Sequence, residues 1–298
     1  MNCNLLVILG PTASGKTRLA VAAAEALGGE IISADSRQVF RRMDIGTGKD
    51  LAEYGNTPYH LIDVLEPGAE FSVFTFQQLF TTAFSDISSR GKLPILAGGT
   101  GLYLDAVLRG YEFKEVPENK ALRSELALLS MAELQDRLAV LNPQLHNSTD
   151  LLERERLLRA IEIASAESSF KVSLPELRPA IFGIRMEREV VRRRITARLR
   201  ERLQNGMIEE VAALLAEGVP PERLDAYGLE YRYINLHLSG SLNRNDMYQK
   251  LNSAIHDFAK RQENWFRKME KHGLQIIWLD GSSDMLPTLL REWRQRAA

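Results

Sequence analysis

The stretch that decides the fold is Leu5-Leu-Val-Ile-Leu9, followed at once by Gly10-Pro-Thr-Ala-Ser-Gly-Lys-Thr17. The five apolar residues predict a buried strand, and the alanine-rich segment Thr17–Leu27, which ends at Gly28-Gly29, predicts a helix. The eight residues between them match G-x-x-x-x-G-K-S/T in the place that this motif requires. The N–H groups of such a loop and the positive end of the helix dipole favour bound phosphate groups.

The loop supplies the first candidate binding residues. Its backbone is expected to surround a diphosphate, with Lys16 adding a full positive charge, and the Thr17 hydroxyl suits a Mg²⁺ ligand. The alternative is a glycine turn that binds nothing, which the flanking strand and helix disfavour. The candidate diphosphate-binding residues of the loop are Gly10, Pro11, Thr12, Ala13, Ser14, Gly15, Lys16 and Thr17.

Outside the loop, short apolar runs alternate with helical segments, which favours an α/β fold with a parallel sheet like that of P-loop NTPases. A helical insertion at 115–178 is expected to interrupt a core formed by 1–114 and 179–298, because strand signals are lacking there. The other expected strands are Ile31-Ile32, Tyr59–Val64, Leu93–Ala97, Ala180–Met186 and Leu274–Leu279, and the longer expected helices are Ser72–Ser89, Glu187–Glu217 and Asp246–Lys271.

The composition excludes several classes of protein. The 298 residues are 45% hydrophobic and 26% charged with a net charge of −1, which is typical of a globular rather than a disordered chain. No run approaches the roughly 18 apolar residues of a membrane helix, and the first residues lack the basic segment of a signal peptide. The single cysteine, Cys3, excludes an internal disulfide and a cysteine zinc site. We therefore expect a cytoplasmic protein with no membrane association.

Arginines gather in the segment Arg185–Arg202, which holds eight arginines and three acidic residues. Three of them, Arg194, Arg198 and Arg202, recur every four residues and therefore share one helix face. Such a cluster can bind a polyanion such as RNA, or it can be a solvated helix face. The charge pattern by itself leaves both interpretations open.

Several segments, taken in order, resemble the bacterial tRNA dimethylallyltransferases, which transfer an isopentenyl group to N6 of an adenosine beside the anticodon. A phosphate loop by itself serves many reactions, whereas an ordered set of motifs is specific. Beyond the loop, the matching pieces are Ser33-Ala-Asp-Ser-Arg-Gln38, Met43-Asp-Ile-Gly-Thr47 with Lys49, His60-Leu-Ile-Asp63, Phe71-Ser-Val73, Gly98-Gly-Thr-Gly-Leu-Tyr103, Arg156–Glu162, Gly206–Val211 and Phe258-Ala-Lys-Arg-Gln262 with Trp265.

The resemblance implies an enzyme that transfers the dimethylallyl group from dimethylallyl diphosphate to N6 of the adenosine at tRNA position 37, 3′ of the anticodon, and releases diphosphate. The loop, Lys16 and Mg²⁺ would stabilise the charge that builds on the leaving diphosphate. Asp35 would accept the proton from N6, and Thr100 would lie at the reaction centre. The plainer readings are a local turn of Asp35 with Ser36 and a helix cap at Thr100.

The resemblance also implies residues that contact the anticodon stem-loop of tRNA. Ser36, Arg37 and Gln38, with Asp35 and Thr100, would surround the target base. A helical insertion that grips RNA suits an enzyme that takes a base out of its stack. The remaining implied contacts are Arg123, Arg156 and Arg159 with tRNA and Arg194 with the diphosphate. We expect a monomer, because nothing in these roles demands a second copy.

The chain departs from the family pattern beside two of its motifs. Glu155 stands next to Arg156 where the family has Gln, and an acidic side chain is unfavourable beside an RNA phosphate. Asp50 follows Lys49 where a proline is usual. The phosphate loop and Asp35 match the pattern without change.

Three other functions share parts of this pattern. An isopentenyltransferase that acts on free adenine nucleotides would keep the loop and Asp35, although the insertion and the arginines favour an RNA acceptor. A small-molecule kinase would bind ATP, but Leu93–Ala97 ends without the Asp that commonly holds Mg²⁺, which leaves Asp35 or Asp63 to replace it. An RNA-binding or nucleotide-switch protein would bind tRNA without any transfer.

Overall fold

The computed structural model describes residues 3–111, 113, 115–142, 153–166 and 172–297. The chain divides into two compact units, of which the first is Met1–Tyr111 with Leu174–Ala298 and the second is Glu112–Ser173. The insertion expected from the sequence was 115–178. The second unit begins three residues before the start of that range and ends five residues before its end. Each unit is described by itself.

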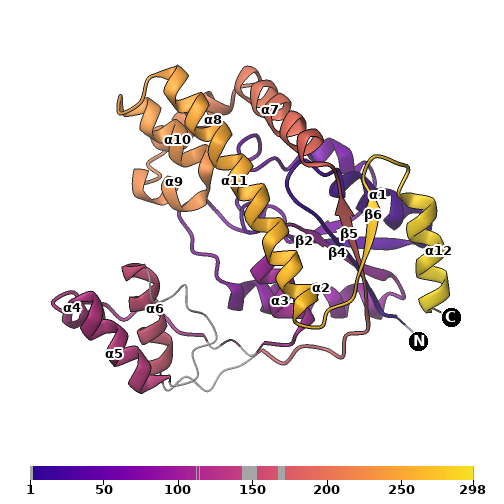
Figure 1. The fold of residues 1–298 in the computed structure, drawn as a ribbon, viewed down its shortest axis with the longest axis horizontal. Coiled ribbons are helices and arrows are strands. Elements are labelled where there is room, and N and C mark those ends of the chain that lie inside the picture. Colours follow the sequence, from indigo (N-terminus) through magenta and orange to yellow (C-terminus); the bar gives the residue numbers. More distant parts are fainter. Residues whose placement is uncertain (1–2, 112, 114, 143–152, 167–171, 298) are drawn as a thin grey trace. The chain divides into compact units, whose positions relative to one another are not determined.

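A sheet of parallel strands forms the centre of the first unit (Figure 1). Leu6 pairs with Ile95 on one side and with Ala180 on the other, so the first strand of the chain is central. The strand order is β3-β2-β4-β1-β5-β6. The expected α/β fold is therefore confirmed. The strands are β1 (Leu5–Leu9), β2 (Gly29–Ala34), β3 (Tyr59–His60), β4 (Leu93–Gly98), β5 (Pro179–Arg185) and β6 (Ile276–Asp280).

Helices cover both faces of this sheet. Leu5, Val7 and Leu9 of β1 join the hydrophobic core beneath α2, α3 and α11, whereas Leu6 and Ile8 join the core beneath α1 and α12. Burial on both faces explains why the strands are continuous apolar runs. The helices of these layers are α1 (Lys16–Leu27), α2 (Val73–Ser89), α3 (Gly101–Leu108), α11 (Arg244–Lys271) and α12 (Leu286–Ala297).

The remaining helices of the first unit share a third hydrophobic core with α11. The single helix expected over Glu187–Glu217 is wrong, because the chain breaks at Gly206, whose φ of +95° lies outside the helical region. Glycine adopts this left-handed conformation without steric cost. The two resulting helices are α7 (Arg188–Gln204) and α8 (Met207–Ala216), and they are followed by α9 (Pro221–Tyr227) and α10 (Leu229–Leu238).

The strand expected at Tyr59–Val64 is also wrong beyond its first two residues. Leu61 and Asp63 adopt left-handed backbone conformations, with φ of +65° and +56°, and these turn the chain after β3. Leu61 is buried, and the Asp63 carboxylate forms an ion pair with the fully buried amino group of Lys49. Tertiary contacts therefore stabilise a conformation that non-glycine residues adopt rarely.

The second unit has a small hydrophobic core of its own. Leu126, Leu134, Leu138, Leu157 and Ile161 are all fully buried and belong to one cluster. Short side-chain caps define where two of the helices begin, since Asn119 and Ser130 accept hydrogen bonds from backbone N–H groups in the first turn. The helices are α4 (Lys120–Leu126), α5 (Met131–Leu141) and α6 (Arg154–Ser165).

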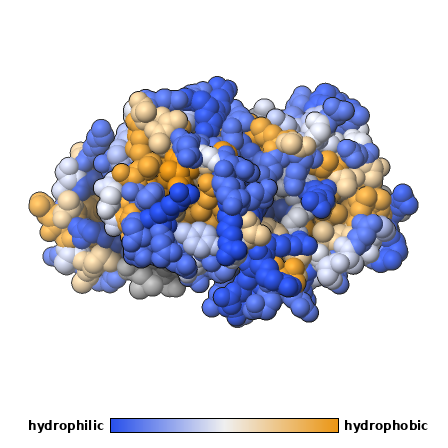
Figure 2. Space-filling model, turned by 90° about the horizontal axis from the view of Figure 1, so that it is seen from above, coloured by the Kyte–Doolittle hydropathy of each residue, from blue (hydrophilic) through white to orange (hydrophobic). Residues whose placement is uncertain are grey.

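The face of the molecule shown in Figure 2 is mainly polar. Hydrophilic side chains cover most of the face shown in Figure 2, and hydrophobic side chains form separate patches between them. Among the described residues, no helix has both the length and the apolar character needed to cross a membrane.

Candidate functional site

The phosphate loop joins β1 to α1 through a tight backbone path. Gly15 has a φ of +86°, which favours glycine at this position. A Cβ atom on Gly10 would lie 2.7 Å from Ser14 Oγ, so the backbone and this hydroxyl are closely packed. Ser14 is almost fully buried, and within the described part of the chain its hydroxyl has no hydrogen-bond partner. A buried hydroxyl left without a partner indicates a site shaped for a polar ligand.

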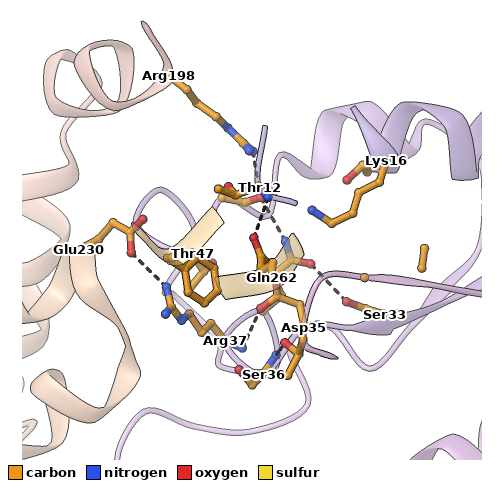
Figure 3. Close-up of a pocket in the computed structure, with 18 of the residues that line it drawn as sticks. Thr12, Lys16, Ser33, Asp35, Ser36, Arg37, Thr47, Arg198, Glu230 and Gln262 are labelled. Atoms are coloured by element: carbon orange, nitrogen blue, oxygen red, sulfur yellow. Dashed lines mark hydrogen bonds and ion pairs between the residues drawn. The ribbon is translucent and has the colours of Figure 1, made fainter. Parts of the chain in front are cut away.

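A pocket lies at the carboxyl edge of the sheet, beside this loop (Figure 3). Parallel strands bring their carboxyl ends to one edge, which is where such folds bind ligands. Lys16 points into the pocket from α1 and Arg198 points into it from α7, while Asp35 faces it from the end of β2. The predicted site residues that line this pocket are Thr12, Lys16, Thr17, Asp35, Ser36, Arg37, Gln38 and Thr100.

Asp35 and Thr100 lie together because β2 and β4 are neighbours. Ala34 pairs with Gly98, and a Cβ atom on Gly98 would overlap Ala34, so glycine allows the close approach. The backbone N–H of Ser36 donates to Thr100 Oγ1 at 3.2 Å. Asp35 Oδ1 accepts from the Arg37 N–H at 2.9 Å, which is the local turn of the plainer reading. The other carboxylate oxygen, Oδ2, takes no part in that hydrogen bond.

Arg37 and Gln38 are held by the protein itself. The Arg37 guanidinium donates to the Glu230 carboxylate at 3.2 Å and lies over the Phe258 ring, 4.9 Å from its centroid. The Gln38 amide donates to the Gly48 carbonyl at 3.2 Å. Gln38 Oε1 also accepts from the Ser33 hydroxyl at 3.3 Å. Both side chains line the pocket and shape its walls.

Positive charge dominates the loop side of the pocket. Burial lowers the pKa of Lys16 to about 8, against the opposing effect of the Asp35 carboxylate, and the cations Arg198 and Arg202 lower it further. Burial also lowers the pKa of Arg202. Within the described residues, Arg202 Nη2 is buried without a hydrogen-bond partner. Three half-buried cations that repel one another indicate a binding site for a multiply charged anion.

The placement of Arg194 differs from the role expected for it. Its guanidinium donates to the sulfur of Met186 at 3.5 Å, at the surface, and it is not among the residues that line the pocket. Arg198 and Arg202 take this place instead. Four residues advance a helix by about 6 Å, so Arg194 shares their helix face but lies nearer the beginning of α7.

Gln262 is a site residue that the sequence analysis named only as the end of the motif Phe258-Ala-Lys-Arg-Gln262, without a role. Its Oε1 accepts from the Thr12 N–H at 2.8 Å, and its Nε2 donates to the Gly99 carbonyl at 2.9 Å. One buried amide therefore joins the phosphate loop to the turn that carries Thr100. Its place in that motif was the signal that could have pointed to this role.

Gln262→Leu is expected to weaken binding of a phosphorylated ligand about tenfold and to lower the free energy of unfolding by about 1–3 kcal/mol. Leucine leaves the Thr12 N–H and the Gly99 carbonyl buried without partners. Isothermal titration with inorganic diphosphate and chemical denaturation would measure the two effects. The control is Gln275→Leu, at an exposed position. Lower stability with unchanged diphosphate affinity would make Gln262 a purely structural residue.

The candidate arginines of the second unit divide into two groups. Arg123 and Arg159 both form ion pairs with Glu162, whose side chain is fully buried. They therefore neutralise a carboxylate inside this unit. Arg156 is half-exposed and forms an ion pair 3.1 Å long with the exposed Glu153, which leaves it more accessible to an external anion. Glu155 contributes a further carboxylate, 3.8 Å from Arg123.

The parallel sheet, the phosphate loop at its carboxyl edge and the cation-rich pocket define a P-loop α/β protein with a site for a phosphorylated ligand beside a carboxylate. Comparison with known proteins narrows this class. The family described as IPP transferase matches residues 38–269, and the family described as isopentenyl transferase matches residues 3–57.

Individual proteins give the same result. The tRNA dimethylallyltransferase 2 of Syntrophotalea carbinolica is 67% identical over 98% of this chain and 99% of that protein. The tRNA dimethylallyltransferase 1 of Geotalea uraniireducens is 64% identical over 96% of this chain and 95% of that protein. The solved structure of the tRNA isopentenylpyrophosphate transferase of Bacillus halodurans has a TM-score of 0.74 and 30% identity, covering 99% of this chain and 96% of that one. The chain belongs to the IPP transferase family. Within this family, it is similar to the tRNA dimethylallyltransferases over nearly its whole length.

Proposed function

We propose that this chain transfers the dimethylallyl group of dimethylallyl diphosphate to N6 of the adenosine at tRNA position 37, 3′ of the anticodon, and releases diphosphate. The observation that carries the proposal is one pocket with two chemically different ends. Lys16, Arg198 and Arg202 form a cationic end, and Asp35 with Thr100 forms a polar, carboxylate-bearing end. A diphosphate ester and an amine that loses a proton require these two environments side by side.

The cationic end would bind the diphosphate and stabilise it as a leaving group. When the bond between C1 and the bridging oxygen breaks, its electron pair goes to the diphosphate. The loop N–H groups, Lys16, Arg198 and Arg202 then face more negative charge than before, which lowers the barrier. Arg198 and Arg202 take the role that the family resemblance suggested for Arg194.

Thr17 lines the pocket and would hold Mg²⁺ together with oxygens of the diphosphate. When bound, the ion would supply additional positive charge to the leaving group. The described residues contain no group of three or more His, Cys, Asp or Glu side chains that could hold a metal ion. The residues present therefore fit an ion bound chiefly through phosphate oxygens, which is usual for Mg²⁺.

The polar end would receive the adenosine. N6 forms the new bond to C1, and one of its protons passes to the Asp35 carboxylate, so that the charges balance. The Arg37 turn holds Asp35 Oδ1 in place, and the Ser36 N–H fixes the Thr100 hydroxyl beside it. Gln38, Arg37 and Phe258 would form the walls around the base.

The second unit would hold the anticodon stem-loop, with Arg156 as its most accessible candidate for a phosphate contact. We assign Arg123 and Arg159 mainly to the stability of that unit, because both neutralise the buried Glu162. A tRNA acceptor agrees with the monomeric, cytoplasmic protein that we expect. A kinase would have to hold Mg²⁺ through Asp35, which lines the pocket, because Asp63 is engaged by Lys49.

An acceptor comparison tests the proposal. Purified protein, Mg²⁺ and radiolabelled dimethylallyl diphosphate would be mixed in parallel with unmodified tRNA, AMP, ADP and ATP. We expect the radiolabel to appear on tRNA, with little on the free nucleotides. Label on AMP with none on tRNA would identify a nucleotide isopentenyltransferase, and ATP turnover without any transfer would identify a kinase.

The kcat/KM for the donor is expected to fall as the pH rises through about 8, the value to which burial lowers the pKa of Lys16. Only protonated Lys16 attracts the diphosphate, and kcat/KM reports ionisations of the free enzyme. Steady-state rates between pH 7 and about 10 would show the fall. Lys16→Arg should be slower but flatter over this range, because arginine stays charged. An equal decline in this variant would assign the ionisation to another group.

A further inference from the structure

Asp50 occupies an unusual position beside the cationic end of the pocket. It precedes a short 3₁₀ helix (Leu51–Tyr54) and has a left-handed backbone, with φ of +42° and ψ of +48°. Its Oδ2 accepts a hydrogen bond from Arg198 Nη2 and lies 3.9 Å from Arg202 Nη2. One carboxylate oxygen therefore contacts both α7 arginines that line the pocket.

The backbone of this segment brings the three side chains together. Arg198 Nη2 also reaches the Gly48 carbonyl, at 3.4 Å. A Cβ atom on Gly48 would overlap the Arg202 guanidinium, so the arginine packs directly on the glycine backbone. Proline, which the family pattern usually places at position 50, has a φ near −65° and could not adopt the conformation of Asp50.

The two sides of this ion pair differ in burial. The Arg202 side chain is 14% exposed, whereas that of Asp50 is 43% exposed. The Arg198 side chain, at 31%, is also less exposed than that of Asp50. The Asp50 carboxylate is therefore the group of the three that turns into water at the smallest cost when an anion enters the pocket.

We propose that Asp50 is a built-in counter-anion, which holds Arg198 and Arg202 while the phosphate loop is free and is displaced by the diphosphate of the donor. This inference rests on the proposed function, because it takes the two arginines as diphosphate ligands. Asp50 would thus keep the arginines oriented before binding and compete with the diphosphate for them. Competition lowers donor affinity, and because the product also carries the diphosphate group, it eases release of the product as well.

Equilibrium binding of inorganic diphosphate to Asp50→Asn tests the proposal. Asparagine tolerates the left-handed backbone and has nearly the same shape, so the fold should persist. Because the lost ion pair is partly exposed, we expect diphosphate to bind about three- to tenfold more tightly than to the wild type. The wild-type or a lower affinity in this variant would overturn the proposal.

Glu53→Gln is the matched control. Glu53 is exposed and close enough to raise the pKa of Lys16, and it belongs to the same short helix. The Glu53→Gln substitution removes one negative charge, as Asp50→Asn does. No described contact joins Glu53 to Arg198 or Arg202. We expect less than about a twofold change for it. An equal gain in both variants would show a general effect of charge and would overturn the specific role of Asp50.

Two further comparisons separate the remaining explanations. In an Arg198→Gln background, Asp50→Asn should change diphosphate affinity by less than about twofold, since its main partner is gone; a full gain there would contradict the proposal. The gain in diphosphate affinity of Asp50→Asn should be the same with and without Mg²⁺. A loss of diphosphate affinity that occurs only when Mg²⁺ is present would make Asp50 a metal ligand instead. Wild-type protein that binds no diphosphate would also overturn it. A protein that binds diphosphate as expected but does not modify tRNA would contradict the proposed function and leave the role of Asp50 in diphosphate binding intact.

Discussion

Asp35→Asn is expected to lower kcat by about a hundred- to ten-thousandfold, while the affinity for tRNA changes by less than about twofold. The variant loses the proton acceptor for N6, and general base catalysis contributes this much in other enzymes. Asparagine can still accept from the Arg37 N–H, so the local turn and the contact surface remain. Single-turnover rates at saturating donor and tRNA would measure the chemical step, and filter binding would measure the affinity.

A matched comparison for Asp35 is Asp63→Asn, at another acidic residue that follows a short strand of the same sheet. Asp63 is engaged by Lys49 and does not line the pocket. This variant should lower stability more than the rate of the chemical step. A wild-type rate in Asp35→Asn would remove Asp35 from the mechanism, whatever the effect at position 63.

Lys16→Ala is expected to lower kcat/KM for the donor by about a hundred- to a thousandfold. The lysine contributes a full charge in a half-buried place, where electrostatic stabilisation of a leaving group is more effective than in water. The affinity for tRNA should stay within about twofold. Steady-state kinetics with varied donor, together with tRNA binding, would separate the two effects.

Arg18→Ala provides the control for Lys16. Arg18 lies on the same helix, is exposed, and is not part of the pocket lining. Removing its charge should change donor kinetics by less than about twofold, because exposed charges are screened by water and salt. If Lys16→Ala reduced only tRNA binding, the phosphate-loop assignment would be contradicted.

The sheet core could be predicted from the sequence because its strands are short apolar runs with clear ends. Leu5–Leu9 was predicted with its exact bounds, and Leu93–Ala97 differs from the observed strand by one residue. The segment after His60 could not be predicted in this way, since Leu61 and Asp63 take left-handed conformations that depend on tertiary contacts. The break at Gly206 had a local signal, an Asn-Gly pair, but the helical periodicity on both sides concealed it.

The part of the candidate site that follows neighbouring strands could be predicted from the sequence. Residues that follow β1, β2 and β4 meet because these strands are neighbours, so Lys16, Asp35 and Thr100 line one pocket. Gln262 and Arg202 come from helices much later in the chain, and a sequence shows no distance between such segments. Four-residue spacing placed the α7 arginines on one face, but it could not say which turn of the helix reaches the loop.

The most direct test of the central claim is to locate the transferred group on the tRNA. Unmodified tRNA with adenosine at position 37 would be incubated with the protein, Mg²⁺ and dimethylallyl diphosphate, and then digested and sequenced by mass spectrometry. A second tRNA would carry guanosine at that position. We expect one isopentenyl mass increment, which is confined to the adenosine at position 37 of the first tRNA and is absent from the second tRNA. An increment at another nucleotide, on both tRNAs, or on neither would contradict it.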